Sequence, residues 1–134
     1  MRVVVDTNIL FSFFWDNSFT KKLILSSEFE LISSEQALKE IKKYKKEIMR
    51  KTKITDKQFE NYYKQLKLVV DFQKEKDYQK DKKEASGFSP DEYDSDFFAL
   101  CLKYGCFLWS NDKILKEQSR VKVLSTEDII ELFF

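Results

Sequence analysis

Acidic side chains follow two strongly apolar segments of the chain. Asp6 follows residues 2–5 directly, and a polar turn that contains Ser110 and Asp112 follows residues 106–109. Such continuous apolar runs suit strands that are buried on both faces of a parallel sheet. Because ligands of open α/β sheets bind beyond the carboxyl ends of the strands, both acids are expected at one edge of the sheet. Taken alone, Asp6 could equally be the cap of the next helix.

Two further carboxylates fall where the predicted elements bring them towards Asp6 and Asp112. Glu40 lies in a predicted helix, beside a position that faces the core. Asp94 lies at the start of the helix that precedes the second apolar segment, where free backbone amides favour negative charge. Asp96, two residues further on, is the rival candidate for the same place.

These carboxylates together indicate a metal site. Four carboxylates at one point repel each other and raise each other's pKa unless a cation compensates. Ligands that are all oxygen suit Mg²⁺ or Mn²⁺, which bind substrate phosphates as well. Such a metal lowers the pKa of bound water without any histidine, so the set predicts hydrolysis of a phosphodiester. Each acid singly is better explained as a solvated charge or a helix cap, and only the combination carries the prediction.

The composition restricts the chemistry further. The chain has no histidine, which excludes Ser-His-Asp, Cys-His and histidine-based ribonuclease catalysis. With two cysteines, neither a tetrahedral zinc site nor a disulfide framework is expected. A length of 134 residues, 43% of them apolar, suits one domain with a substantial core. We find no signal-peptide pattern and no apolar run of membrane length, so a cytoplasmic location is predicted.

Alternating strand and helix patterns predict a parallel sheet flanked by helices. Strands are expected near 2–5, 29–32, 106–109 and 121–124, and helices at 19–27, at 91–104 and after Ser125. Gly105 stands where a glycine commonly ends a helix. The charged segment 72–88 is interpreted as a surface helix or a mobile loop.

Two capping boxes, Ser33 with Gln36 and Thr55 with Gln58, introduce two more helices. The first helix has apolar residues at 38, 41, 44 and 48, and the second has an apolar stripe from 59 to 70. We expect them to form a hairpin that stands off the sheet as an arm or lid. The hairpin and the charged segment after it occupy roughly residues 35–88 of a single domain that covers residues 1–134.

The first helix of this hairpin is strongly basic, since residues 39–53 include eight basic and two acidic side chains. A solvated face is the commoner reason for a lysine-rich helix, but the nearness of Glu40 favours cations that hold RNA phosphates. The basic face consists of Lys39, Lys42, Lys43, Lys46 and Arg50.

An aromatic cluster follows the first strand, at residues 11, 13, 14 and 15. Its side chains could stack nucleic-acid bases or receive a partner peptide. Packing in the core is expected for at least half of them.

The motifs described above resemble a PIN domain. The resemblance rests on VVVDTN at 3–8, ALKEI at 37–41, DSDFFAL at 94–100, WSNDK at 109–113 and VLSTEDII at 123–130. It covers essentially the whole chain, with residues 44–88 the least typical part. It implies a three-layer α/β/α sandwich around a parallel sheet of four to five strands, often as a homodimer. Asp96 stands where the family usually has a non-acidic residue, and the lysine-rich hairpin is more elaborate than in a minimal member.

By this resemblance, the metal-binding acids of the family match Asp6, Glu40, Asp94 and Asp112. The polar residues that support them match Thr7, Asn8 and Ser110. Members are Mg²⁺- or Mn²⁺-dependent ribonucleases, including VapC-type toxins, which pair with an antitoxin protein, and RNA-processing nucleases. Toxin and processing roles are not separated by the residues themselves.

Three functions are compatible with these residues. The first is a metal-dependent endoribonuclease, in which the acids hold the metal and the basic helix binds RNA. The second is a catalytically silent PIN-like domain that binds RNA or protein, but such a module has no need of four mutually repelling acids. The third is a phosphatase of the haloacid-dehalogenase type, which needs a second Asp two residues after the first. Position 8 is Asn, so the phosphatase ranks last.

Overall fold

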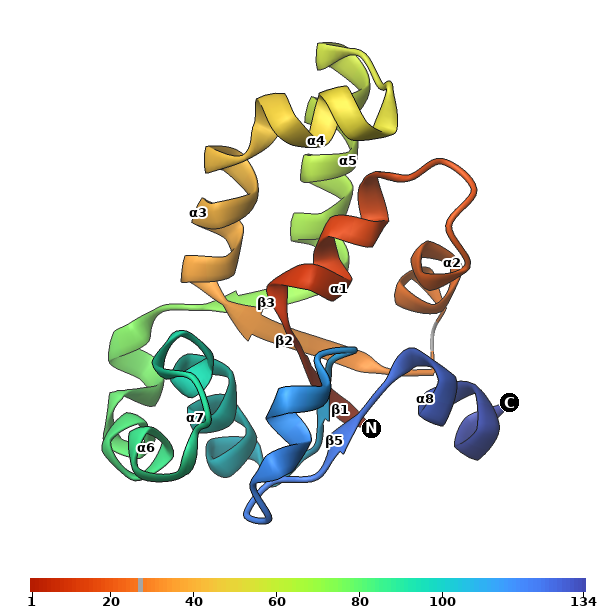
Figure 1. The fold of residues 1–134 in the computed structure, drawn as a ribbon. Helices are drawn as coiled ribbons and strands as arrows, with labels where there is room; N and C mark the ends of the chain where they lie inside the picture. Colours follow the sequence, from red (N-terminus) through yellow and green to blue (C-terminus); the bar gives the residue numbers. More distant parts are fainter. Residues whose placement is uncertain (27) are drawn as a thin grey trace.

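A parallel β-sheet of five strands forms the centre of the molecule (Figure 1). The computed structural model describes residues 1–26 and 28–134. The strand order is β3-β2-β1-β4-β5, and every neighbouring pair is parallel. The strands are β1 (Arg2–Val5), β2 (Glu30–Ser34), β3 (Val70–Gln73), β4 (Leu108–Trp109) and β5 (Val123–Leu124).

The strand order places a topological switch point between β1 and β4. From β1 the chain builds outwards through β2 to β3, then crosses back to add β4 on the other side of β1. The crevice that such a reversal leaves at the carboxyl ends of the strands is where open α/β sheets bind ligands. Asp6 follows β1 directly, and Ser110 follows β4 directly, so both lie at this point.

Helices make up most of the remaining described chain. Short 3₁₀ turns are present at Ser12–Phe14, Glu92–Asp94 and Lys113–Glu117. The α-helices are α1 (Thr7–Phe11), α2 (Phe19–Leu25), α3 (Glu35–Lys43), α4 (Lys45–Thr52), α5 (Asp56–Val69), α6 (Glu75–Phe88), α7 (Ser95–Tyr104) and α8 (Thr126–Phe133).

Both faces of the sheet are covered. Val3, Val4 and Val5 are all fully buried, although successive side chains of a strand point to opposite faces. Helix α7 packs against β1 and β2 on one side, with α6 packed on α7, while α1 and α3 to α5 lie on the other side (Figure 1). The predicted α/β/α sandwich with a central parallel sheet is therefore confirmed.

The edge strand β3 is an element that the sequence pattern did not predict. Helix α5 ends at Val69. The next residues form a strand that pairs with β2, with Val70 beside Leu31. The charged segment that follows is an ordered helix, α6, because Tyr78 and Ala85 are buried on its inner side. The alternative of a mobile loop at 72–88 was wrong.

The first arm of the predicted hairpin is two helices in the structure and not one. Residues 35–52 form two helices, because Tyr44 has φ −96° and ψ 17°, outside the helical range. At the break, the Tyr44 ring packs edge to face against Phe11. This tertiary contact prevails over the helical spacing of apolar residues, which predicted one continuous helix. The capping box at Thr55 and Gln58 is confirmed by both of its hydrogen bonds, 2.8 and 3.1 Å.

Other helix boundaries shift by a few residues. Ser34 rather than Ser33 caps α3, because the Ser33 hydroxyl already donates to the Val5 carbonyl at 2.7 Å. The helix predicted from 91 begins at Ser95, after a 3₁₀ turn. Helix α2 ends at Leu25, and the predicted end at position 27 lies outside the described residues.

Two later predictions, the end of α7 and the start of α8, are confirmed. Gly105 ends α7 with φ 61°, and Ser125 caps α8 in a complete capping box. In the described part of the chain, no helix has the length and apolar character that a membrane crossing requires.

Candidate active site

A small polar cavity lies at the carboxyl ends of β1 and β4. Its volume is about 220 Å³. We call it the acid cavity, because five of its lining side chains are carboxylates that come from distant parts of the chain. It is lined by Asp6, Thr7, Asn8, Glu40, Asp91, Tyr93, Asp94, Phe97 and Asp112.

Asp6 is held rigidly by its two carboxylate oxygens. Oδ1 accepts a hydrogen bond from the Ile9 amide at 3.0 Å, so the residue is also the N-cap of α1. Oδ2 accepts a hydrogen bond from the Ser110 hydroxyl. The helix-cap and site interpretations of Asp6 are therefore compatible, since one oxygen serves each purpose.

Ser110 links two of the acids. Its hydroxyl donates to Asp6 and accepts a hydrogen bond from the backbone amide of Asp112 at 3.1 Å. The Asp112 carboxylate in turn accepts from the Ile114 amide at 3.1 Å. This chain of bonds fixes the spacing between the acid after β1 and the acid after β4.

Asp94 has a strongly perturbed carboxyl group. Partial burial, together with the negative charges of Asp6, Asp91, Asp112 and Glu40, raises its pKa to about 7. Burial also raises the pKa of Asp6, against the hydrogen bonds from Ser110 and Ile9. A cation in the cavity would relieve the repulsion that raises the Asp94 pKa.

The structure separates Asp94 from Asp96. Asp94 lies at the N-terminus of α7 and lines the acid cavity, without a side-chain hydrogen bond to its own helix. Asp96 is buried beside α6, where its carboxylate pairs with Lys82 at 3.0 Å. Lys82 also pairs with Glu75 at 2.6 Å. Asp96 therefore tethers α7 to α6 and is not part of the cavity.

Sequence reasoning missed three residues of the cavity, namely Asp91, Tyr93 and Phe97. Asp91 caps the 3₁₀ turn that precedes α7 and accepts a hydrogen bond from the Tyr93 amide at 3.0 Å. The dense spacing of acids at 91, 92, 94 and 96 was a signal that could have drawn attention to Asp91.

The residue types in the cavity fit a hard divalent cation. All five acids offer oxygen, and the supporting Thr7 and Asn8 offer oxygen as well. Within residues 1–26 and 28–134, no three acidic or cysteine side chains come close enough to enclose an ion by themselves. Mg²⁺ retains several of its waters in protein sites, so a spread set of carboxylates is compatible with it. Asp6, Glu40, Asp94 and Asp112 are the groups that would hold such an ion.

The basic residues of α3 and α4 do not form one continuous surface. Lys42 lies 5.7 Å from the centre of the Tyr63 ring, so it faces α5. Lys39 and Arg50 each lie 4.0 Å from a glutamate of their own helix. Lys43 lies over the Tyr44 ring at 5.5 Å, one turn beyond Glu40, and Lys46 is exposed on α4.

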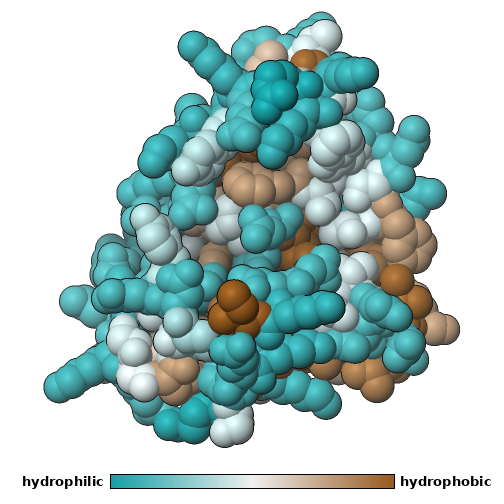
Figure 2. Space-filling model, viewed as in Figure 1, coloured by the Kyte–Doolittle hydropathy of each residue, from teal (hydrophilic) through white to brown (hydrophobic). Residues whose placement is uncertain are grey.

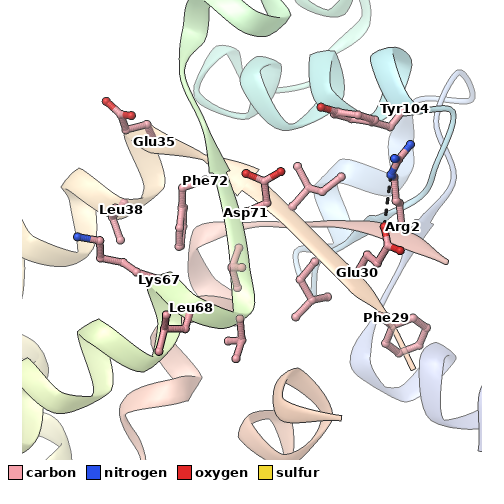
Figure 3. Close-up of a pocket in the computed structure, with 14 residues that line it drawn as sticks. Arg2, Phe29, Glu30, Glu35, Leu38, Lys67, Leu68, Asp71, Phe72 and Tyr104 are labelled. Carbon is pink, nitrogen blue, oxygen red and sulfur yellow. Dashed lines mark ion pairs between the residues drawn. The ribbon is translucent and has the colours of Figure 1, made fainter. Parts of the chain in front are cut away.

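The acid cavity is not the largest hollow in the protein. A cavity of about 890 Å³ lies along the edge strand β3, with Leu68, Phe72 and Asp71 around it (Figure 3). An ion pair of 3.5 Å between Arg2 and Glu30 lies at one side of it (Figure 3). Because this hollow lies beside the sheet and not at the switch point, the convergence of carboxylates locates the site better than size does.

The comparison with protein families agrees with this architecture. A family model described as PIN domain matches residues 4–131. No curated protein matches the chain. PIN domains are generally nucleases and generally use divalent metal ions, so a function of the nuclease type follows from the match. With nearly its whole length covered, the chain belongs to the PIN domain family.

Proposed function

We propose that this protein is an endoribonuclease that depends on Mg²⁺ or Mn²⁺ and acts in the cytoplasm. The observation that carries the proposal is the convergence of Asp6, Glu40, Asp94 and Asp112 on one cavity, where partial burial and the neighbouring negative charges raise the Asp94 pKa to about 7. A binding module gains nothing from this repulsion, whereas a metal-dependent hydrolase needs the charge to hold its cation. The free thiols Cys101 and Cys106 suit a reducing compartment.

In this proposal the residues of the site have three roles. The four acids hold the metal, which when bound supplies water of lowered pKa and neutralises phosphate oxygens. Ser110 positions Asp6 and Asp112 through its two hydrogen bonds. Lys43, one turn beyond Glu40 on α3, would bind a neighbouring phosphate of the RNA.

The proposal is tested by cleavage of end-labelled single-stranded RNA with Mn²⁺, Mg²⁺ or EDTA. Wild-type protein should cut only with a metal, and Asp6→Asn should lose the activity while it stays folded, because Asn can still cap α1. Equal cutting by both proteins would reveal a contaminant. RNA binding without cleavage under every metal would favour the silent binding domain.

A toxin role with an antitoxin partner remains a prediction from the resemblance. A short adjacent reading frame that encodes a DNA-binding antitoxin would support it. Absence of such a frame would favour an RNA-processing role.

A further inference from the structure

A second cavity, of about 390 Å³, opens between α1 and α4. We call it the aromatic groove, because three of its lining side chains are aromatic. The space-filling view shows a hollow on this face, between α3, α4 and α1, with apolar atoms in its floor and hydrophilic residues around it (Figure 2). The groove is lined by Phe11, Trp15, Tyr44, Glu47, Ile48, Lys51 and Thr52.

The aromatic side chains of the groove are partly free of the core. Trp15 is 48% exposed and Tyr44 is 42% exposed, whereas Phe13 and Phe14 of the same cluster are fully buried. Phe11 and Tyr44 meet edge to face with their centres 6.5 Å apart. The cluster is therefore divided, with two rings in the core and two that face the groove from the first helical segment.

The groove adjoins the acid cavity on two helices. On α1, Asn8 lines the acid cavity, and Phe11, three residues later, lines the groove. Glu40 of α3 lines the acid cavity, and Tyr44, the residue that ends this helix four residues later, lines the groove. Three or four residues are one helical turn, or about 5.4 Å along each axis. The lining positions of the two cavities are therefore about one helical turn apart along the chain in both places.

The charge around the groove suits a polyanion. Residues 39–53, which include its α4 wall, contain eight basic and two acidic side chains. Glu47 in the wall is matched by Lys51 at 3.3 Å and by Arg50 at 4.0 Å. The Lys43 ammonium group lies at the Tyr44 ring, on the side of the groove nearer to Glu40. An apolar, aromatic slot with Lys51 in its wall and Lys43 at the Tyr44 ring matches a base that projects from a phosphate backbone.

We propose that the aromatic groove stacks an unpaired nucleobase of single-stranded RNA next to the phosphate at the acid cavity. The inference rests on the proposed function for the phosphate, and it adds a subsite for the neighbouring base. Trp15 and Tyr44 are the stacking residues, and Lys51 contacts the backbone. A base inside a duplex is stacked on its neighbours and cannot enter, so single strands are preferred over duplexes.

Tryptophan fluorescence tests the inference without any cleavage. The chain has two tryptophans, of which Trp109 is fully buried, so a change on RNA binding reports Trp15. The probes are a short single-stranded RNA oligonucleotide and an abasic oligonucleotide of the same length, both in EDTA. The intact RNA should quench Trp15, and Trp15→Ala should weaken its binding by roughly 5- to 150-fold. Phe19→Ala, which removes a 56% exposed ring on α2, is the matched control and should bind like wild type.

The abasic RNA separates stacking from attraction to phosphate. It should bind wild type more weakly than intact RNA does, and Trp15→Ala should distinguish the two RNAs less than wild type does, because only Tyr44 is left to stack the base. Equal affinity of wild type for both RNAs, or equal effects of Trp15→Ala and Phe19→Ala, would overturn the inference. Absence of any RNA binding, in EDTA and in Mg²⁺ alike, would overturn it too and would favour a protein partner for the groove.

Cleavage assays then distinguish the two proposals. If Trp15 binds RNA as described but no metal supports cleavage, the groove stands and the nuclease proposal fails. If wild type and Trp15→Ala cut RNA with the same kcat/KM, the nuclease stands and the groove inference fails.

Discussion

Asp94 combines partial burial with four neighbouring carboxylates, and both effects disfavour its ionised form. Its pKa rises from 3.8 in the unfolded chain to about 7 in the native protein. The native state therefore binds this proton more tightly, so the free energy of unfolding decreases as the pH rises from about 4 to above 7. Burial of Asp6, whose pKa is also raised, acts in the same direction.

We expect Asp94→Asn to stabilise the metal-free protein at pH 8. Solvent screens part of the repulsion at this half-buried group, so the gain should be about 1 kcal/mol, or roughly 2–5 °C in Tm. Thermal melts in EDTA between pH 5 and 8 should show a decreasing Tm for wild type and a flatter profile for the variant. Added Mg²⁺ should raise the Tm of wild type more than that of the variant. A variant less stable than wild type at pH 8 would show that Asp94 carries no electrostatic penalty.

In the proposed site, Ser110 would act on a bound metal only through Asp6 and Asp112. Ser110→Ala removes the donor to Asp6 and the acceptor of the Asp112 amide, which should cost about 1–3 kcal/mol of stability. Affinity for Mn²⁺ should fall roughly 10- to 100-fold, as for other residues that orient metal ligands.

Ser33→Ala is the matched control for this change. Ser33 is equally buried but donates to the Val5 carbonyl and contacts no acid of the cavity through its hydroxyl. It should lose stability and keep its affinity for Mn²⁺, measured by calorimetry on folded protein. Equal Mn²⁺ affinities of the two variants would remove the positioning role of Ser110.

At the scale of elements, the two glycines of the chain have opposite roles. Gly105 ends α7 with φ 61°, whereas Gly87 lies inside α6, and an added Cβ would meet no atom within 4 Å at either position. Gly105→Ala should therefore destabilise the protein by about 1 kcal/mol through backbone strain alone. Gly87→Ala should stabilise it by about 0.5 kcal/mol, because alanine favours the helix. Urea unfolding of both variants measures this difference, and a shared sign would contradict it.

The same elements show what sequence patterns can predict. Strand β1, helix α7 with its Gly105 end, the capping box at Thr55 and the helix start at Ser125 depend on local signals, and the structure contains all of them. The break at Tyr44 and the strand β3 depend on distant partners, Phe11 and β2 respectively. The spacing of apolar residues within one segment does not reveal which distant segment it packs against, so these two features could not be predicted.

At the scale of the molecule, the carboxylates converge because of the strand order. Carboxyl ends of parallel strands share an edge, which allowed Asp6 and Asp112 to be paired from sequence. The choice between Asp94 and Asp96 required the tertiary structure, because only the packing of α6 on α7 brings Lys82 to Asp96. Asp91 was missed for the same reason, since its place depends on the 3₁₀ turn before α7.

The polarised charge of the whole chain should make RNA binding strongly dependent on salt. Lys43 lies one turn from Glu40, whereas Lys42 faces the Tyr63 ring on α5. Lys43→Ala should reduce the slope of log K against log [KCl] by about 1, and Lys42→Ala should leave it unchanged. Fluorescence titrations of RNA at several KCl concentrations measure both slopes. Equal slopes for the two variants would exclude Lys43 as a phosphate contact.

The most direct test of the acid cavity compares Asp94→Asn with Asp96→Asn in metal-dependent RNA cleavage. The two residues lie on the same turn of the chain, but only Asp94 lines the cavity, while Asp96 pairs with Lys82. With Mn²⁺ at saturation for wild type, Asp94→Asn should lose at least about 100-fold in kcat/KM, an amount that corresponds to nearly 3 kcal/mol. Asp96→Asn should lose stability but keep its rate per folded molecule. Loss of cleavage in Asp96→Asn alone, with Asp94→Asn fully active, would contradict the assignment of the site.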